Sequence, residues 1–214
     1  PEGIQGPDLM NNMMEQAEKF GTDIRYEDVV KLELAGEVKR VHLEDEVLET
    51  RTVIFSTGSA YRKLGLEEED KYSGHGVSYC ATCDGFFFRD QDIIVVGGGD
   101  SAMEEATFLT TFAKSVTVVH RRDELRASAA MAKRALENPK INFAWNSRVS
   151  ALHGEGALES VTLTDTVTGQ TRELEATGLF VAIGSSPRSE LVRDQLELDA
   201  AGYVVVSHPS TRTN

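Results

Sequence analysis

The chain has 214 residues, of which 40% are hydrophobic and 27% charged, a composition typical of soluble globular proteins with one large or two small domains. Its 22 basic and 35 acidic residues give a formal net charge of −13, which argues against a nucleic-acid surface and against binding to anionic membranes. Because there is no run of about eighteen apolar residues and no basic-then-apolar leader, we expect no transmembrane helix and no signal peptide, and a cytoplasmic location.

The first sixty residues predict one helix, a small sheet and one buried strand. Apolar residues at helical spacing predict a helix over 6–20, with its Leu and Met side chains in a core. Alternating apolar residues over 30–48 predict an antiparallel meander. Residues 52–55 predict a buried strand that runs into Ser56-Thr57-Gly58. In the connection that follows, we expect the acidic run 67–70 to form a solvated face.

The middle of the chain has a different pattern of apolar residues. Apolar strands predicted at 93–96, 116–119 and 141–145 alternate with helices predicted at 100–112 and 125–137. This βαβαβ pattern implies an α/β fold with a parallel sheet that is covered on both faces. Hairpin-like segments at 149–163 and 172–176 follow, and a strand at 179–183 ends at Gly184.

The ends of the segments at 52–58 and 179–184 resemble each other, which suggests a duplicated architecture. We therefore predict a central domain over 61–188, inserted into a flanking domain made of 1–60 and 189–214. The linkers would lie at about 61–66 and 184–188. Both ends of the sequence look cut, so we expect the chain to be an internal part of a longer protein.

Cys80 and Cys83 are the two cysteines of the chain, in the sequence Cys80-Ala81-Thr82-Cys83-Asp84-Gly85. Two sulfurs that flank two residues can close a small ring and exchange electrons. Zinc is the main rival, but a structural zinc site needs four ligands and there is no second C-x-x-C to supply the others. We favour redox chemistry and expect no metal; a metal site and an inert core pair remain the alternatives.

A glycine-rich segment, Gly97-Gly98-Gly99-Asp100-Ser101-Ala102, follows a predicted strand and opens a predicted helix. In that context the G-x-G-x-x-A pattern predicts dinucleotide binding. Gly97 permits the tight turn, Gly99 lets the backbone approach a pyrophosphate at the helix N-terminus, and Ala102 lets the helix pack close to the strand.

Basic residues follow the second strand of this unit, in His120-Arg121-Arg122 and at Arg126. A site for NAD would present a carboxylate here, whereas planar guanidinium groups suit the 2′-phosphate of NADP. The alternative is three basic residues on a solvated surface. We include His120 in the cofactor-binding segment, although a histidine at a strand end is more often structural.

These three motifs, in this order and spacing, resemble the low-molecular-weight thioredoxin reductases. Ser56-Thr57-Gly58 looks like the first flavin-side Ala-Thr-Gly of that family, and residues 179–187, with Ile183 and Gly184, are similar to its second hinge region. The resemblance implies a homodimeric flavoprotein that passes a hydride from NADPH to FAD, then two electrons to its own disulfide, and then to thioredoxin. It also implies that the central domain over 61–188 is a Rossmann-like NADPH-binding domain, inserted into a second, partial FAD-binding α/β domain made of 1–60 and 189–214.

The resemblance also implies residue roles. Cys83 would face the flavin, and Cys80 would attack the disulfide of thioredoxin. Asp84 would protonate a thiolate leaving group, which agrees with the general rule that exchange is faster when the departing sulfur is protonated; a helix or turn cap is the other interpretation of Asp84. Arg121, Arg122 and Arg126 would read the 2′-phosphate, and the central domain would rotate about its two linkers.

The sequence departs from the family at both ends. The family's first G-x-G-x-x-G segment and its terminal Gly-Asp segment, which both serve FAD, do not occur, so we expect the chain to be inactive by itself. The alternatives are the reductase component of an alkyl hydroperoxide reductase, a non-enzymatic redox-sensing NADP-binding module, which Asp84 disfavours, and a zinc-binding interaction domain.

Overall fold

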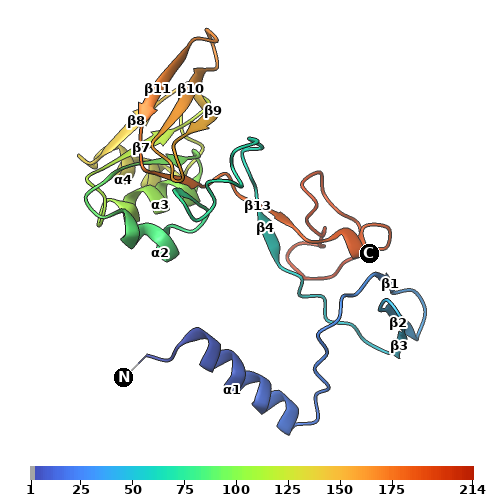
Figure 1. Cartoon of the computed structure of the whole chain (residues 1–214). Coiled ribbons are helices and arrows are strands. Elements are labelled where there is room, and N and C mark those ends of the chain that lie inside the picture. Colours follow the sequence, from blue (N-terminus) through green and yellow to red (C-terminus); the bar gives the residue numbers. More distant parts are fainter. Residues whose placement is uncertain (1–2) are drawn as a thin grey trace. The chain divides into compact units, whose positions relative to one another are not determined.

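The computed structural model describes residues 3–214 and divides the chain into two compact units (Figure 1). One unit combines the residues up to Thr57 with Arg188–Asn214, and the other is Gly58–Pro187. The second unit is therefore one continuous segment of the sequence, while the first unit is assembled from two segments that are distant in the sequence.

A five-stranded parallel sheet forms the centre of the second unit, in the order β5-β12-β6-β7-β8. Its strands, in chain order, are β5 (Val77–Ser78), β6 (Asp92–Val96), β7 (Ser115–Val119), β8 (Ile141–Ala144) and β12 (Gly178–Val181). Helix α3 (Asp100–Leu109) connects β6 to β7, and α4 (Ala129–Leu136) connects β7 to β8. The predicted α/β fold with a parallel sheet is confirmed.

Both faces of this sheet are covered, as the continuous apolar strands predicted. An antiparallel sheet of β9 (Ser147–His153), β10 (Ser160–Asp165) and β11 (Thr171–Glu175) contributes Val149, Leu152 and Val161 to a buried cluster that also holds Ile94 of β6. The next residue, Val95, belongs to a second cluster with side chains of α3 and α4. Side chains alternate between the faces of a strand, so neighbouring residues of β6 enter different halves of the core.

The two predicted linkers lie side by side in the second unit. Strand β4 (Ser59–Tyr61) pairs antiparallel with β13 (Ser185–Pro187), and Ser185 is opposite Tyr61. Next to this ladder, the backbone N–H of Arg62 donates to the carbonyl oxygen of Gly184 over 3.0 Å. The connections into and out of the middle of the chain are therefore joined by backbone hydrogen bonds.

The first unit contains helix α1 (Gly6–Lys19) and the predicted meander, with strands β1 (Lys31–Glu33), β2 (Lys39–His42) and β3 (Val47–Thr50). The returning segment carries the 3₁₀ turn η2 (Glu190–Val192). Just beyond it, the side chain of Gln195 accepts a hydrogen bond from Leu34 N–H and donates one to the carbonyl oxygen of Leu32. One amide side chain thus ties the two segments of this unit together. No helix among residues 3–214 is long and apolar enough to cross a membrane.

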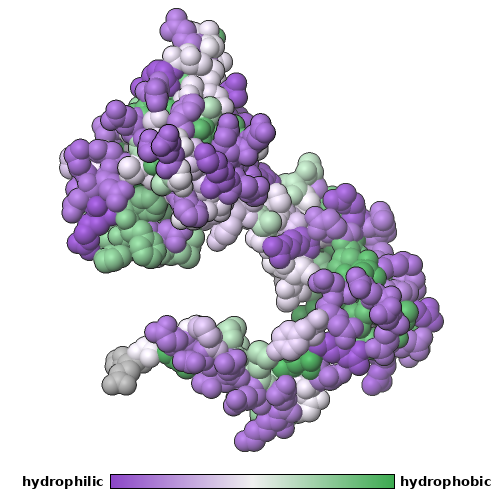
Figure 2. All heavy atoms as spheres, in the orientation of Figure 1, coloured by the Kyte–Doolittle hydropathy of each residue, from purple (hydrophilic) through white to green (hydrophobic). Residues whose placement is uncertain are grey.

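The expected burial of the helix at 6–20 is wrong. Met10 is 49% exposed and Met13 is 55% exposed, and no residue of α1 is buried. Hydrophobic atoms are visible on the surface of α1 in Figure 2. The periodicity correctly predicts an amphipathic helix, but no element within the described residues covers its apolar stripe.

The strand predicted at 52–55 is also wrong, because these residues form no strand and Ile54 is 92% exposed. A strand exists only where a neighbour pairs with its backbone, and none of the described residues does so here.

The acidic run at 67–70 is only partly a solvated face. Glu69 is 1% exposed, and its carboxylate accepts hydrogen bonds from the backbone N–H groups of Leu64 and Gly65 and from the hydroxyl of Tyr79. A carboxylate can be buried where several donors replace the water it loses. The expectation is wrong for Glu69 because sequence gives no sign of these three donors.

Candidate functional site

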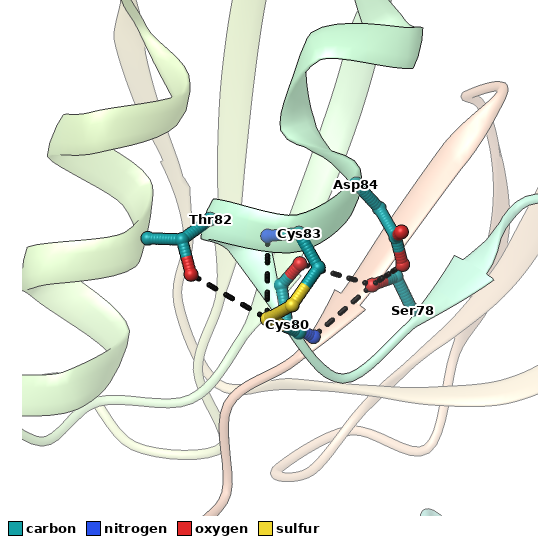
Figure 3. Close-up of a disulfide and its surroundings, with 5 residues drawn as sticks. All are labelled: Ser78, Cys80, Thr82, Cys83 and Asp84. Atoms are coloured by element: carbon teal, nitrogen blue, oxygen red, sulfur yellow. Dashed lines mark hydrogen bonds between the residues drawn. A yellow bond between two sulfur atoms is a disulfide. The ribbon is translucent and has the colours of Figure 1, made fainter. Parts of the chain in front are cut away.

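Cys80 and Cys83 form a disulfide at the start of α2 (Ala81–Asp84), with 5.3 Å between their Cα atoms (Figure 3). The buried strand β5 ends two residues earlier, and the chain turns at once into the helix. The backbone N–H of Cys83 donates to Sγ of Cys80 over 3.2 Å, so this sulfur caps the helix. Cys80 is half-buried and Cys83 is exposed. The sulfur pair is therefore open to solvent from one side.

Asp84 is held beside this disulfide by Ser78, a buried residue of β5 (Figure 3). The hydroxyl of Ser78 donates to Oδ2 of Asp84 over 2.6 Å and accepts from the backbone N–H of Cys80 over 3.1 Å. Asp84 also precedes the 3₁₀ helix η1 (Gly85–Phe88), where its side chain makes no capping hydrogen bond. The cap interpretation of Asp84 therefore lacks support, and its carboxylate is oriented towards the residues that flank Cys80.

Exposed aromatic side chains lie directly after the disulfide. Phe86 is 60% exposed and Phe87 is 72% exposed. The ring of Phe86 packs edge-on against Phe112, with 6.1 Å between centroids, and Arg89 lies over its face. A pale green area surrounds this part of the second unit in Figure 2. An exposed apolar patch of this kind is typical of a contact surface for another protein.

A cavity of about 570 Å³ adjoins the disulfide. Cys80 lines it from one side, and α3 contributes Ser101, Glu104 and Glu105 from the other. The pKa of Glu105 is raised to about 7, first by burial and then by the charge of Glu104. An acidic group that titrates near neutral pH therefore lies in the same cavity as one sulfur.

The glycine-rich turn adopts the geometry that its motif predicts. Gly97 has a φ of +154°, and a Cβ atom there would lie 2.4 Å from the carbonyl oxygen of Ala182. At Gly98 a Cβ atom would lie 2.2 Å from the ring of His120. At Gly99, the residue before α3, it would meet no atom within 4 Å. The turn is closed towards the protein and open at the helix N-terminus, which fits a pyrophosphate held by backbone N–H groups.

A cavity of about 720 Å³ surrounds this turn. Its walls include Ser101 from α3 and Ile183 and Gly184 from the segment after β12. Four arginines line it: Arg62, Arg121, Arg126 and Arg148. Arg122 is not among the described residues that line this cavity, although it directly follows Arg121 in the sequence. The cavity carries fixed positive charge, which suits a phosphate monoester.

His120 is 5% exposed and lines the same cavity. Its pKa is lowered, mainly by burial and further by the charge of Arg126. The imidazole is therefore neutral at physiological pH, and its place against Gly98 shapes the turn.

The basic loop is fastened to the glycine-rich turn, and this corrects the predicted helix at 125–137. The carbonyl oxygen of Gly98 accepts from the backbone N–H groups of Arg126 and Ala127. Oδ1 of Asp100 accepts from both the backbone N–H and the hydroxyl of Ser128, each over 2.8 Å, which lowers the pKa of Asp100. These bonds hold the chain in a loop, so α4 begins only at Ala129.

Two residues that the resemblance places on the flavin side and two that it places in the second hinge region have separate surroundings. The hydroxyl of Thr57 donates to the carbonyl oxygen of Arg188 over 2.6 Å, within the first unit. Gly58 begins the second unit with a φ of +67°. Ile183 and Gly184 line the cavity around the glycine-rich turn.

Sequence reasoning missed Ser78, Glu105, Arg62 and Arg148. Arg62 lies in a segment that reads as a linker, and Arg148 lies in a hairpin far from the motif, so neither carries a motif of its own. For Ser78, its place two residues before Cys80 is the only signal. The fold brings these side chains to the two cavities through contacts between distant segments.

Fold and site together define a Rossmann-like dinucleotide-binding domain that carries a C-x-x-C disulfide. In agreement, the family model described as pyridine nucleotide-disulphide oxidoreductase matches residues 3–214. The chain is similar to the thioredoxin reductase of Streptomyces clavuligerus, with 62% identity over 214 residues, which cover 100% of this chain and 66% of that protein. It is 57% identical over 213 residues to the thioredoxin reductase of Mycolicibacterium smegmatis, covering 100% of this chain and 68% of that protein.

Solved structures agree with these sequence matches. The thioredoxin reductase of Lactococcus lactis, in what is described as its FR conformation, matches with a TM-score of 0.80 and 42% identity, over 99% of this chain and 70% of that one. The chain therefore belongs to the pyridine nucleotide-disulphide oxidoreductase family, and within it to the thioredoxin reductases. It spans about two thirds of the length of these relatives. The family uses a flavin and a pyridine nucleotide.

Proposed function

We propose that this chain is the pyridine-nucleotide and dithiol part of an NADPH-dependent thioredoxin-disulfide reductase. One observation carries the proposal: a single unit holds a C-x-x-C disulfide with an adjacent carboxyl group and also an arginine-lined cavity around a glycine-rich turn. The similarity to proteins named thioredoxin reductase supports it.

The cavity around the glycine-rich turn would hold NADPH. Gly97 and Ala102 allow the tight strand-to-helix turn, and Gly99 leaves the space that a pyrophosphate needs. Asp100, Ser101 and their helix N-terminus border that space. Arg121, Arg126 and the more distant Arg122 supply positive charge for the 2′-phosphate, with His120 neutral beneath the turn. When bound, NADPH and FAD would together supply the two electrons that reduce the Cys80–Cys83 disulfide.

Cys80 and Cys83 would carry these electrons to the substrate. As a dithiol, Cys80 attacks the substrate disulfide, one substrate sulfur leaves as a thiolate, and Cys83 then displaces the second while the enzyme disulfide re-forms. Two protons leave the enzyme thiols and two reach the substrate sulfurs. Asp84, held by Ser78, is the acid that protonates a leaving thiolate. Cys83 faces the flavin in the opposite half of the cycle.

The second unit would act as the NADPH domain over about 61–188, and the segments 1–60 and 189–214 as parts of an FAD domain. Thr57 and Gly58 are the candidate contacts to FAD, whereas Ile183 and Gly184 line the cavity proposed for NADPH. The paired strands β4 and β13 lie between Gly58, with a φ of +67°, and Gly184, with a φ of +93°. Glycines in this conformation at the limits of a two-stranded connection suit a hinge that alternates the groups facing the flavin.

Thioredoxin would be the electron acceptor, and the exposed Phe86 and Phe87 beside the disulfide offer it an apolar contact surface. We also propose a homodimer and a cytoplasmic location; the latter is where a lone C-x-x-C pair is kept available for catalysis.

The zinc-binding alternative is weakened because both thiols are in a disulfide and the described residues contain no group of three or more His, Cys, Asp or Glu side chains that could hold a metal ion. An acceptor other than thioredoxin would use the same residues, so the choice of acceptor must be measured.

The test uses the full-length flavoprotein with NADPH and oxidised thioredoxin. Cys80→Ser and Cys83→Ser should each abolish thioredoxin reduction while NADPH still bleaches the flavin, because nucleotide binding does not involve these sulfurs. Asp84→Asn should slow thioredoxin reduction by about 100-fold, the usual contribution of a general acid. If the wild-type protein fails to reduce thioredoxin, the proposal fails and the redox-sensor alternative gains; if Asp84→Asn is as fast as wild type, the acid role of Asp84 is wrong.

A further inference from the structure

Glu105 is a titratable group for which the reaction above has no use. It lies on α3, the helix that begins at the glycine-rich turn and then passes the disulfide. Ser101, on the first turn of this helix, lines both cavities, whereas Glu105 lines only the one that contains Cys80. Cys83 does not line that cavity. Of the two cysteines, only Cys80 therefore lines the same cavity as Glu105.

The carboxyl group of Glu105 is not satisfied by the protein around it. Its Oε2 atom is buried and has no hydrogen-bond partner among the described residues. The other titratable or charged groups that line the cavity are Tyr61, Tyr79, Glu104 and Arg134, and no ion pair between Arg134 and Glu105 occurs in residues 3–214. A buried carboxylate without a partner is costly, so this group retains its proton to an unusually high pH.

We propose that Glu105 accepts the thiol proton of Cys80 across the cavity that the two residues share, while Asp84 protonates the leaving sulfur. This inference rests on the redox role proposed above for the cysteine pair, and it goes further by giving each sulfur exchange its own proton acceptor. A cavity of about 570 Å³ has ample room for water, which can carry a proton between groups that do not touch.

The proton balance of the exchange step follows. The carboxylate of Glu105 accepts the thiol proton of Cys80, and the resulting thiolate attacks the substrate disulfide. The bond between the substrate sulfurs breaks as the bond to Cys80 forms, and the departing sulfur takes a proton from Asp84. When Cys83 then displaces the second substrate sulfur from Cys80, the thiol proton of Cys83 returns to the carboxylate of Asp84, and the proton held on Glu105 passes to the departing sulfur. No external oxidant or reductant is consumed in this step.

A group that holds a proton near neutral pH is suited to this task. A carboxyl group with an ordinary pKa would be too weak a base to take a proton from a thiol, whereas one that titrates near pH 7 exchanges protons efficiently in both directions. Burial and the charge of Glu104 raise the pKa of Glu105, and so give it this property.

The test isolates Cys80 from nucleotide, flavin and thioredoxin. Full-length protein with Cys83→Ser keeps Cys80 as a free thiol, and its alkylation by iodoacetamide is followed by mass spectrometry of the Cys80 peptide between about pH 5.5 and about pH 9, a range that brackets both groups. Alkylation reports the thiolate fraction. Two coupled ionisations should give a two-step profile, since the ionised carboxylate of Glu105 disfavours the thiolate.

Adding Glu105→Gln should leave one step at lower pH and alkylation about threefold to tenfold faster at pH 8, the effect of removing one nearby negative charge. Glu104→Gln should keep both steps but move the first to lower pH, because the charge of Glu104 raises the pKa of Glu105. Glu137→Gln, on an exposed residue at the end of α4, is the matched control and should change nothing.

Profiles of the Cys83→Ser protein with and without Glu105→Gln that superimpose would overturn the inference. If Glu105→Gln does not fold, the exposed Glu104→Gln decides, since an unmoved first step contradicts the inference equally. Because the assay contains neither NADPH nor thioredoxin, its result is independent of whether the proposed reductase activity is found.

Discussion

The two cavities of the second unit differ in the kind of charge that lines them. The cavity around the glycine-rich turn has four arginines, whereas the cavity beside Cys80 has Glu104 and Glu105 against a single Arg134. Guanidinium groups keep their charge at every physiological pH, so they suit an anion that must simply be held. A carboxyl group that titrates near pH 7 suits a site where protons move. The difference separates a binding site from a reaction site within one fold.

Helix α3 connects these two cavities. Glu105 lies five residues after Asp100, the first residue of α3, which is roughly 7.5 Å along the helix axis at 1.5 Å per residue. Substitutions separated by about 7–10 Å or more that share no partner are usually additive. Substitutions in one cavity should therefore leave the function of the other cavity unchanged, and the variants described next test this independence.

The largest effect should come from the glycine-rich turn. Gly97→Ala would place a Cβ atom 2.4 Å from a backbone carbonyl oxygen at a φ of +154°, and we expect a loss of about 3 kcal/mol or more in the free energy of unfolding. Gly99→Ala meets no atom, so it should change stability by less than about 1 kcal/mol and yet weaken NADPH binding at least about tenfold by filling the space for the pyrophosphate.

Urea unfolding and NADPH titration of the full-length protein distinguish these two effects. Equal stability losses for Gly97→Ala and Gly99→Ala would show that the turn is not closed on one side and open on the other. Neither variant should alter the alkylation profile of Cys80 once folded, which tests the independence of the two cavities.

The glycine-rich turn and the parallel sheet were predictable because local sequence determines them. A strand, a turn that only glycine permits and a helix are adjacent in the chain, and continuous apolar strands such as β6 reveal burial on both faces. The start of α4 was less predictable. Helical spacing predicted a helix from Leu125, but the loop before α4 is held by Gly98 and Asp100, about thirty residues earlier in the sequence.

Burial in the first unit was not predictable, since it depends on what packs against each element. The spacing of Met10 and Met13 predicts a helix correctly, and the apolar run around Ile54 looks like a strand, but both need a partner surface that no local pattern specifies. The same holds in reverse for Glu69, which is buried and accepts a hydrogen bond from Tyr79, and for Glu105, whose Oε2 atom is buried. Charged residues read as surface from sequence alone.

A smaller effect is expected at the arginine-lined cavity. Arg121→Ala and Arg126→Ala should each raise the KM for NADPH by about tenfold to about 100-fold, the range for a lost charge-assisted contact, and should leave the KM for NADH nearly unchanged because NADH lacks the 2′-phosphate. Arg122 does not line the cavity, so Arg122→Ala is the matched control with a clearly smaller effect.

Initial rates with each nucleotide at low and high salt provide the measurement. An equal rise for NADPH and NADH would assign these arginines to the shared pyrophosphate instead of the 2′-phosphate. An effect of Arg122→Ala as large as that of Arg121→Ala would contradict the lining of the cavity.

The smallest effect concerns stability at the disulfide cavity and depends on pH. The pKa of Glu105 is about 7 in the folded protein, against an ordinary value of 4.5 for a glutamate. Between these values the folded state keeps a proton that the unfolded chain releases, so this group makes the protein less stable as pH rises from about 4.5 to about 7. Glu105→Gln removes that penalty. Because Glu105 is only partly buried, solvent screening reduces the gain, and we expect the variant to be more stable than wild type by about 1 kcal/mol at pH 8 and by little at pH 5.

Urea unfolding at both pH values, with Glu137→Gln as a control, measures this difference in stability. A gain that is the same at pH 5 and pH 8 would mean that Glu105 does not titrate in the folded protein between these values. The two cavities would then no longer differ in whether the charge that lines them changes with pH.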